Sequence, residues 1–315
     1  MRTAAKRIPA LAVVVVLVTF LTFWMSSQLA GNPCIILLGN QARGEALAEC
    51  EADLNLDDPF LLRYAQWFGD FVTGDLGQSY INNIETTELL ANALPATLFL
   101  MLYSVALALV ISIPLGVAMA YRADTRFDRT ASAGLYGFLA VPNFALAVLL
   151  VFWFAIRWDW FPAIGYTSPT DDLVEHVRGM VLPVVALAAG QVAVFARILR
   201  TDMIATLSED YIQMAKAKGL RDAPILFRHA LKPSSFTLLT VAGINIVSLI
   251  SGTLIIEVLF GINGVGSLIY GSVIQRDYLI LQSLVALTAI LVVAVNFAVD
   301  LLYGRLDPRV RHAAA

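Results

Sequence analysis

The stretch DYIQMAKAKGLRDAPILFRHALKPS, from Asp210 to Ser234, lies between two long apolar segments and concentrates positive charge. Its Lys and Arg residues alternate with Ala, Ile, Leu and Phe, and Gly219 interrupts this pattern. A glycine just after the basic last turn of a helix favours a left-handed backbone that ends the helix. The stretch therefore predicts two short helices that meet at a small basic elbow.

Capping signals define both predicted helices. Ser208 is expected to cap a helix that begins at Glu209, because a side-chain oxygen at that position accepts a hydrogen bond from a free backbone N–H. Asp210 then lies in the first turn, where the helix dipole favours an anion. Asp222 is expected to cap the second helix, with Pro224 in its first turn.

The elbow itself is small and partly apolar. Ala215, Ala217 and Gly219 keep it free of bulky side chains, and Tyr211 and Met214 add adaptable apolar contact. One interpretation is a knob that fits a groove in a cytoplasmic partner. The alternative is a basic amphipathic helix that rests on anionic lipid headgroups.

The rest of the chain is too apolar for a soluble protein. Its mean hydropathy is +0.76, and 14% of its residues are charged, against about 25% in average soluble chains. A membrane-spanning helix needs about 20 apolar residues, and several segments approach this length without a Lys, Arg, Asp or Glu. The six predicted spans are residues 8–29, 97–120, 133–156, 180–196, 236–256 and 279–299.

Charge sets the predicted orientation. With a cytoplasmic N-terminus, the only Lys or Arg residues outside are Arg43, Arg63, Arg157, Arg178 and Arg276, and all others of the 21 fall inside. The positive-inside rule therefore places both termini and the basic hairpin in the cytoplasm. The first apolar segment is expected to be a retained span, because a cleaved signal peptide has an apolar core of only about 7–15 residues.

The first outer segment, residues 31–92, is predicted to form a small acidic cap domain. Pro59 favours a helix that starts near Asp58, although a disordered acidic loop is the alternative. Cys34 and Cys50 lie in this segment, where disulfides are permitted. Closing a loop of this length stabilises a protein by about 3 kcal/mol, and two free thiols are the alternative. The expected helical stripe is Phe60, Leu61, Tyr64, Trp67, Phe68 and Phe71.

Glycines and polar residues mark two further features. The outer segment EVLFGINGVGSLIYGSVIQRDY, from Glu257, has too many glycines for a plain spanning helix. It predicts a re-entrant or interfacial element, which is tolerated at membrane depth only where protein or water surrounds it. Inside the spans, Asn143, Gln191 and Asn245 are candidates for the pore lining, and hydrogen bonding between helices is their alternative role.

DYIQMAKAKGL resembles the EAA loop of ABC importer permeases, in the form used by the peptide/nickel permease family. Asp210, Ala215 and Gly219 match the family pattern D-Y-x-x-x-A-x-A-K-G. Other resemblances follow in family order over nearly the whole chain, closest to the first-permease subunit of di- and oligopeptide importers. They are GNPCIILLG with Asn32 where Asp is usual, RYAQW, GDLGQS, LPATL, EVLFGINGVG with Asn263 where Pro is usual, and DLLYGRLDPRVR.

The expected fold is an all-α polytopic membrane protein with six transmembrane helices, both termini inside, an extracytoplasmic cap domain and a cytoplasmic coupling-helix hairpin. The expected regions are 1–30 (N-terminus and first span), 31–92 (cap), 93–304 (permease core, with the hairpin at 208–233) and 305–315 (cytoplasmic tail). The resemblance implies that the hairpin docks on an ATPase through Asp210, Tyr211, Met214, Ala215, Ala217, Lys218 and Gly219.

The expected function is that of a permease subunit in the cell (plasma or inner) membrane, forming half of the path of an ATP-driven peptide importer. The chain has no G-x-x-x-x-G-K-[ST] phosphate loop, so it is expected to be non-catalytic and to hold no cofactor or metal. ATP and Mg²⁺ would bind to partner subunits. The resemblance implies a second permease, two ATP-binding subunits or domains and an extracytoplasmic binding protein.

Two other classes of function remain as alternatives. An ion- or proton-coupled secondary carrier usually places ionisable residues inside its spans, and the predicted spans contain no acidic or basic residue. A membrane enzyme would need a catalytic constellation. However, His176, His229 and His312 are far apart in the sequence, with no metal-ligand pair or G-x-S-x-G motif.

Overall fold

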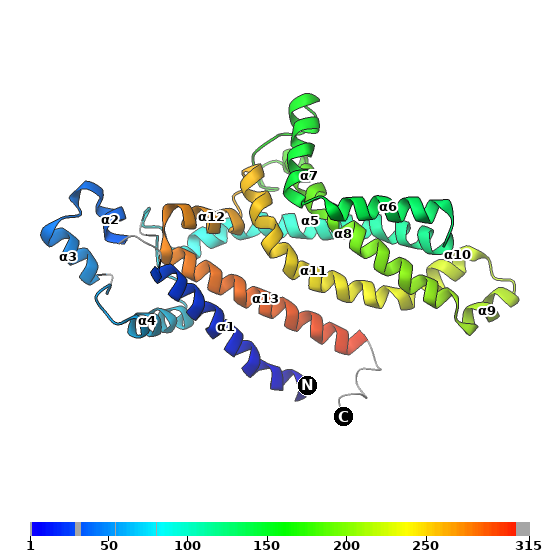
Figure 1. Cartoon of the computed structure of the whole chain (residues 1–315), viewed down its shortest axis with the longest axis horizontal. Helices are drawn as coiled ribbons and strands as arrows, with labels where there is room; N and C mark the ends of the chain where they lie inside the picture. Colours follow the sequence, from blue (N-terminus) through cyan, green and yellow to red (C-terminus); the bar gives the residue numbers. More distant parts are fainter. Residues whose placement is uncertain (1, 29–32, 54, 80, 307–315) are drawn as a thin grey trace. The chain divides into compact units, whose positions relative to one another are not determined.

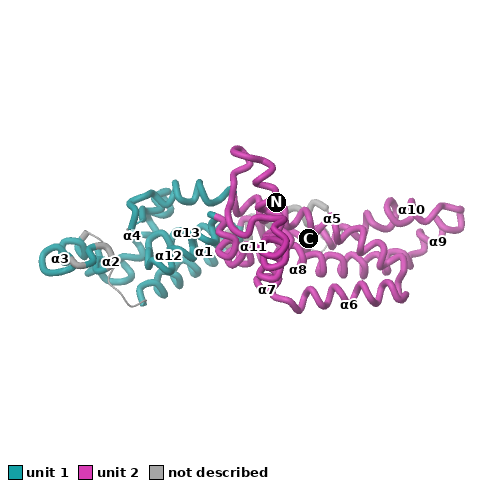
Figure 2. The backbone as a smooth tube through the Cα atoms, turned by 90° about the horizontal axis from the view of Figure 1, so that it is seen from above, with its two compact units in different colours: residues 1–95, 263–293 teal, residues 96–262, 294–315 magenta. Residues whose placement is uncertain are grey.

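The computed structural model describes residues 2–28, 33–53, 55–79 and 81–306. These residues form helices and one isolated antiparallel bridge, between Gln78 and Glu85 (Figure 1). They divide into two compact units, coloured separately in Figure 2. Unit 1 comprises residues 1–95 and 263–293, and unit 2 comprises residues 96–262 and 294–315. Two features of the family resemblance lie outside the described residues. They are Asn32, which stands where the family usually has Asp, and the end of the motif DLLYGRLDPRVR.

Unit 1 packs aromatic side chains of α4 against α1 and α13. Phe23, Trp67, Phe71 and Ala286 are buried together, with Tyr64 and other aromatic residues around them. The predicted aromatic stripe is confirmed except for Leu61, which is 67% exposed. The helices of this unit are α1 (Arg2–Gln28), α2 (Pro33–Leu38), η1 (Gly39–Gln41), α3 (Gly44–Asp53), α4 (Phe60–Thr73), the start of α5 (Thr86–Tyr121), α12 (Val265–Gln275) and most of α13 (Tyr278–Leu306).

The aromatic helix begins slightly later than the sequence predicts. Pro59 is the residue before the first helical turn, with an extended backbone (ψ 139°), so α4 starts at Phe60. The helix ends at Gly74, whose left-handed backbone (φ 98°) matches the predicted turn. The Tyr64 hydroxyl lies 2.9 Å from the Thr19 hydroxyl and ties α4 to α1.

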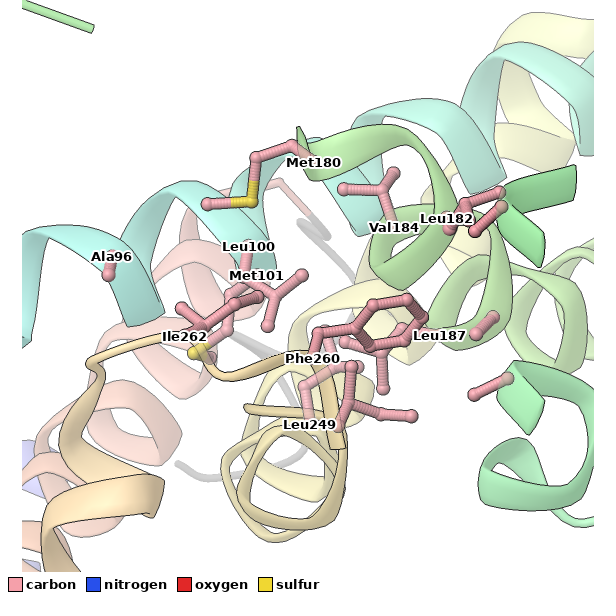
Figure 3. Packing of buried hydrophobic residues seen from close by; sticks show 14 residues of the cluster. Ala96, Leu100, Met101, Met180, Leu182, Val184, Leu187, Leu249, Phe260 and Ile262 are labelled. Atoms are coloured by element: carbon pink, nitrogen blue, oxygen red, sulfur yellow. The ribbon is translucent and has the colours of Figure 1, made fainter. Parts of the chain in front are cut away.

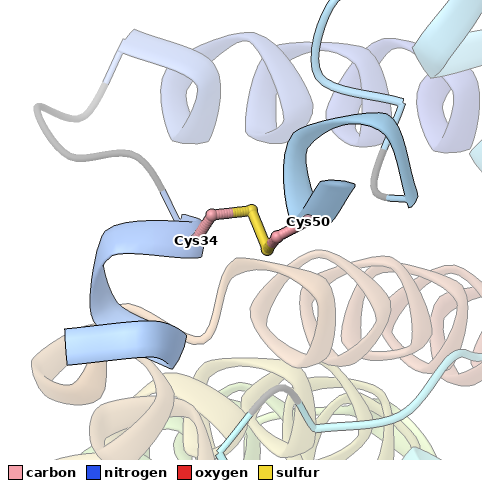
Figure 4. The surroundings of a disulfide bond; sticks show 2 residues. All are labelled: Cys34 and Cys50. Carbon is pink, nitrogen blue, oxygen red and sulfur yellow. A yellow bond between two sulfur atoms is a disulfide. The ribbon is translucent and has the colours of Figure 1, made fainter. Parts of the chain in front are cut away.

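A disulfide joins the two small helices that follow α1. Cys34 of α2 is bonded to Cys50 of α3 (Figure 4), as the sequence predicts, and Cys34 is fully buried. The bond holds α2 and α3 together although neither helix is long enough to be stable alone. This part of the outer segment is therefore folded and cross-linked, not a disordered acidic loop with free thiols.

Four helices among the described residues are long and apolar enough to span a membrane, and a fifth span is possible if a bent pair counts as one. They are Thr86–Tyr121, Leu173–Leu207, Asp222–Phe260 and Tyr278–Ala298, which contain most or all of the second, fourth, fifth and sixth predicted spans. The first predicted span is also helical, but its apolar part, Ala12–Gln28, is shorter than these four.

The structure corrects the third predicted span, residues 133–156. This segment is not one helix, because α6 (Arg126–Ala140) and the helix Asn143–Arg157 are bent by 97° at the break between them. Pro142 causes the break, since it lacks a backbone N–H and restricts the preceding residue to extended conformations. Val141 accordingly adopts φ −90° and ψ 121°.

The glycine-rich segment after α11 contains a short helix, in agreement with the prediction that it is not a plain spanning helix. α11 ends at Phe260, and Gly261 follows with a left-handed backbone (φ 62°). α12 then runs for 11 residues, or about 16 Å at about 1.5 Å per residue. That length is roughly half of a hydrocarbon core of about 30 Å, so α12 does not cross a membrane.

Unit 2 is built around α8. In its most apolar stretch 61% of the residues are buried, against at most 33% in the other three long helices. Figure 3 shows side chains of α5, α8 and α11 facing one another, among them Leu100, Leu187 and Phe260. The helices of this unit are the rest of α5, α6, α7 (Asn143–Leu150), the π-helix η2 (Val151–Arg157), α8 (Leu173–Leu207), α9 (Asp210–Ala217), α10 (Asp222–Pro224), the π-helix η3 (Ile225–Ala230) and α11 (Leu231–Phe260).

Candidate functional site

The hairpin that follows α8 contains the short helix α9. Glu209 precedes α9 with an extended backbone (ψ 149°) and makes no side-chain capping bond. The predicted cap at Ser208 is wrong, because its hydroxyl donates instead to the Ile204 carbonyl of α8 at 3.0 Å. Asp210 lies in the first turn of α9, as predicted, where its charge stabilises the helix through the dipole.

Gly219 forms the elbow after α9. Its φ of +80° is left-handed, as the sequence predicts. The Leu220 N–H donates to the Ala215 carbonyl at 3.3 Å, and the Gly219 N–H donates to the Lys216 carbonyl at 2.9 Å. This pair of bonds is the Schellman arrangement that ends a helix. A Cβ built on Gly219 would have no atom within 4 Å, so the elbow is open as well as small.

The segment after the elbow is part of a long helix. Arg221 is the extended residue before it (ψ 158°), so the predicted cap at Asp222 is wrong. α10, η3 and α11 run together as one helix, Asp222–Phe260. The prediction of a separate second short helix is therefore also wrong. α9 thus lies at the turn between α8 and the helix that leads into α11 (Figure 1).

A hydrogen bond closes the hairpin across its two arms. The Tyr211 hydroxyl donates to the His229 carbonyl at 3.3 Å. Pro233, four residues after His229, has no N–H to offer this carbonyl, so Tyr211 supplies a donor. Partial burial, and then the charge of Glu209, raise the pKa of Tyr211 above its usual value. The raised pKa keeps the hydroxyl protonated, as a donor, to a higher pH than in an ordinary tyrosine.

The hairpin has a buried side and an exposed side. Ile212 is fully buried and holds α9 in place. Met214 is 59% exposed and Tyr211 46% exposed, so both offer apolar surface. Ala217 and Lys218 are exposed, and Ala215 is half-buried. The structure thus brings all the predicted coupling residues onto one short helix and its elbow.

Two polar contacts tie the hairpin to neighbouring helices. The Tyr121 hydroxyl, at the end of α5, donates to Asp222 at 2.7 Å. The hydroxyls of Thr206 in α8 and Ser234 in α11 lie 3.0 Å apart. Nearby, Arg200 of α8 forms a two-point ion pair with Asp128 of α6 (2.6 Å from Nη2 to Oδ2). These contacts connect α5, α6, α8 and the helix Asp222–Phe260.

Sequence reasoning missed Ile212 and Tyr121 as parts of this site, and it gave Asp222 only a capping role. Ile212 is the one Ile, Leu or Val in α9, and that signal could have identified it as the buried anchor. Tyr121 and Asp222 are 101 residues apart, so no local pattern could have linked them. His176 was predicted only as an isolated histidine. It is buried against the rings of Phe99, Tyr103 and Tyr166.

The three pore candidates do not converge on one hydrogen-bond network. Gln191 donates to the Leu187 carbonyl of its own helix at 3.3 Å, and Asn245 donates to the Val241 carbonyl at 2.9 Å. Asn143 faces α8, since its Oδ1 would lie 3.5 Å from a Cβ on Gly190. The Gln191 Oε1 is buried without a hydrogen bond to any part of the chain that the structure describes. Among the described residues, the side-chain hydrogen bonds of Gln191 and Asn245 stay within their own helices.

Comparison with known proteins identifies the family. Residues 112–312 match the family described as "Binding-protein-dependent transport system inner membrane component". Residues 1–101 match the N-terminal region described for membrane components of the same systems. The chain belongs to this family of multi-pass membrane proteins.

Two curated relatives extend over almost the full chain. The dipeptide transport system permease protein DppB of Bacillus subtilis is 34% identical over 314 residues, covering 98% of both chains. The oligopeptide transport system permease protein AppB of the same organism is 33% identical over 301 residues, covering 94% of both chains. The chain is therefore similar in length and sequence to transport permeases throughout.

Solved structures confirm the fold. A chain of the MetNI methionine ABC transporter, in an inward-facing conformation, superposes with a TM-score of 0.57 at 20% identity. The superposition covers 70% of this protein and 96% of the MetNI chain. A chain of an amino acid ABC transporter gives a TM-score of 0.51 at 16% identity. The helical fold of this protein is thus that of an ABC permease.

Proposed function

We propose that this chain is the permease subunit of an ATP-driven importer of di- or oligopeptides, and that residues 210–219 are its coupling helix. The observation that carries the proposal is the open elbow at Gly219, flanked by the exposed Met214 and Tyr211 on a helix anchored by Ile212. Relatives named as dipeptide and oligopeptide permeases support the substrate class.

The geometry suggests how a push on α9 would reach the membrane. α8 runs without a break from Leu173 to Leu207, and the second arm runs without a break from Asp222 to Phe260. Force applied at the elbow would therefore move two long helices whose buried faces pack together. In this mechanism the hairpin is a two-state element that ATP binding and hydrolysis in a partner would bias.

The other subunits of the importer and the membrane topology are proposed from the resemblance to the family. The chain would form half of the translocation path beside a second, related permease. Two ATPase subunits or domains would bind ATP and Mg²⁺, and an extracytoplasmic binding protein would deliver the substrate. The chain itself would be non-catalytic, with six spans, both termini inside, a cap over residues 31–92 and a core over 93–304. Asn143, Gln191 and Asn245 remain candidates for the path. No comparison supports the alternative of a secondary carrier.

The test is a glycine pair matched in conformation. Gly219→Trp adds a large side chain at the elbow and places it on a left-handed backbone, which costs about 1–2 kcal/mol. Gly74→Trp is the control, because Gly74 also ends a helix with a left-handed backbone and open space around it. We expect the Gly219 variant to insert in the membrane but to lose ATPase co-purification and peptide uptake. The Gly74 variant should keep its ATPase.

A second variant separates a protein partner from lipid. If α9 rests on anionic headgroups, Lys216→Glu with Lys218→Glu should weaken its attachment by about 1 kcal/mol per lost cation, and an added Trp should strengthen it. If α9 docks in a groove, the double-Glu variant should affect ATPase association less than Gly219→Trp does. Full association and transport in the Gly219→Trp protein would refute the coupling assignment.

A further inference from the structure

A cavity of about 330 Å³, lined by both polar and apolar residues, lies within unit 1. One wall comes from residues 79–93, around the start of α5, and the other from residues 263–280, which include α12. Its volume falls in the range of about 300–1,000 Å³ that is typical of small-molecule sites. In the proposed topology both walls belong to extracytoplasmic segments, where an imported solute would arrive.

The lining is rich in carboxamides, and Asp277 is its one acidic residue. Asn82, Asn92, Asn263 and Gln275 line the cavity, and none of its lining residues is a Lys or Arg. All four amide side chains are exposed. A carboxamide both donates and accepts hydrogen bonds, which is also what each peptide unit of a substrate requires. The absence of cations makes the cavity a poor site for phosphate or another free anion.

Buried hydrogen bonds hold this lining in place. The Ser79 hydroxyl lies 2.6 Å from Asp277 Oδ2 and 2.6 Å from Asn82 Oδ1. Ser79 is 1% exposed and Asp277 3% exposed. The hydrogen bond between them is therefore buried, and it joins the two walls of the cavity. Within the wall of residues 263–280, the Ser267 hydroxyl accepts a hydrogen bond from the Gly264 N–H at 3.0 Å. The cavity is therefore built before any ligand arrives, which lowers the entropic cost of binding.

Gly271 keeps the cavity open. It lines the cavity from α12, and a Cβ at this position would meet only Gln275 Nε2, at 3.8 Å. A larger side chain would therefore fit on the helix without a clash, but it would occupy the cavity. Because leucine favours a helix more than glycine does, Gly271→Leu fills the site without weakening α12.

We propose that this cavity binds the main chain of a peptide before the peptide enters the translocation path, with the four carboxamides as hydrogen-bonding partners. The proposal rests on the proposed function, since it takes a peptide as the transported solute. It adds a binding site on the permease itself, apart from the coupling hairpin. Ser79 and Asp277 also line the cavity, but both are almost fully buried and bonded to each other, so we assign them as positioning residues.

The first test measures dialanine uptake by the full complex in proteoliposomes. Gly271→Leu should raise the KM for dialanine at least 10-fold. Ile274→Leu is the matched control on the same helix, because Ile274 is 64% exposed and does not line the cavity. Its KM should equal that of the wild type. An unchanged KM in Gly271→Leu would overturn the proposal.

The second test does not depend on the folding of Gly271→Leu. Because Cys34 and Cys50 are paired, a cysteine introduced at Asn263 or Ile274 is the reactive thiol in the described part of the chain. Dialanine should protect Asn263→Cys from an impermeant maleimide, whereas free alanine, which has no peptide bond, should not. Ile274→Cys should label equally under all conditions. Equal labelling of Asn263→Cys with and without dialanine would contradict the proposal.

These outcomes separate the cavity from the importer assignment. If Gly219→Trp abolishes dialanine uptake while Gly271→Leu imports with the wild-type KM, the importer assignment stands and the cavity proposal fails. If the wild-type complex imports neither dialanine nor a longer peptide, the peptide assignment fails and takes the cavity proposal with it.

Discussion

At the scale of single residues, the proposed coupling site depends on a glycine and a tyrosine. The left-handed Gly219 could be predicted, because a basic helix end followed by glycine is a local signal. The bond from Tyr211 to His229 could not, because it joins residues 18 positions apart. Its need arises only when Pro233 continues the second arm and leaves a carbonyl without its usual N–H donor.

Removing that hydroxyl should loosen the hairpin. Tyr211→Phe deletes a bond worth about 0.5–1.5 kcal/mol, so amide exchange of residues 210–232 should become roughly 2- to 10-fold faster. Hydrogen–deuterium exchange of the purified protein measures this directly. Tyr270→Phe, on α12, is the control and should leave hairpin exchange unchanged. If Tyr211→Phe exchanges like the wild type, the bond does not hold the two arms together.

At the scale of helices, proline was a poor guide to where a span ends. Pro142 ends α6 and turns the chain by 97°, yet Pro183 lies inside α8 without ending it. The difference lies in packing. Pro183 and most of its neighbours are buried within unit 2, so surrounding contacts keep the helix intact. Val141 and Pro142 are both exposed, so comparable packing does not hold the chain helical there. Tertiary packing of this kind cannot be read from a single sequence.

The same packing predicts a sensitive position in α5. A Cβ on Gly116 would lie 3.0 Å from the Ala196 carbonyl oxygen and 3.1 Å from Leu199 Cβ. Gly116→Ala should therefore destabilise the fold by about 1–3 kcal/mol through overpacking, seen as a lower Tm in detergent. Gly134→Ala in α6 is the matched control, since its Cβ would have no atom within 4 Å. That variant should equal or exceed the wild-type Tm, because alanine favours a helix. An equal fall in both Tm values would show that α5 and α8 are not this close.

At the scale of the whole molecule, composition and charge were informative. Four of the predicted spans correspond to long apolar helices, because runs of about 20 apolar residues have few other uses. The grouping into two units was not predictable, since α12 and most of α13 join the N-terminal segments across more than 160 residues of sequence. The cavity in unit 1 was not predictable for the same reason.

The proposed orientation can be tested with single cysteines. Ile81 and Ser208 are both exposed, and the two native cysteines are paired. An impermeant maleimide applied from outside should label Ile81→Cys and miss Ser208→Cys in intact cells, and should label both after the membrane is opened. The expectation follows from the charge asymmetry of the predicted segments. Labelling of Ser208→Cys in intact cells would overturn the placement of the hairpin in the cytoplasm.

The most direct measurement of the central claim is a photo-crosslink from the elbow. A photoreactive amino acid at Ala217, which is exposed beside Gly219, should form a covalent adduct with the ATPase subunit in native membranes. The same group at Asp75, in the proposed extracytoplasmic segment, should form none. We expect the Ala217 adduct to fall sharply when Gly219→Trp is added. An elbow that crosslinks only to lipid, or to the ATPase no more than Asp75 does, would contradict the assignment of residues 210–219 as the coupling helix.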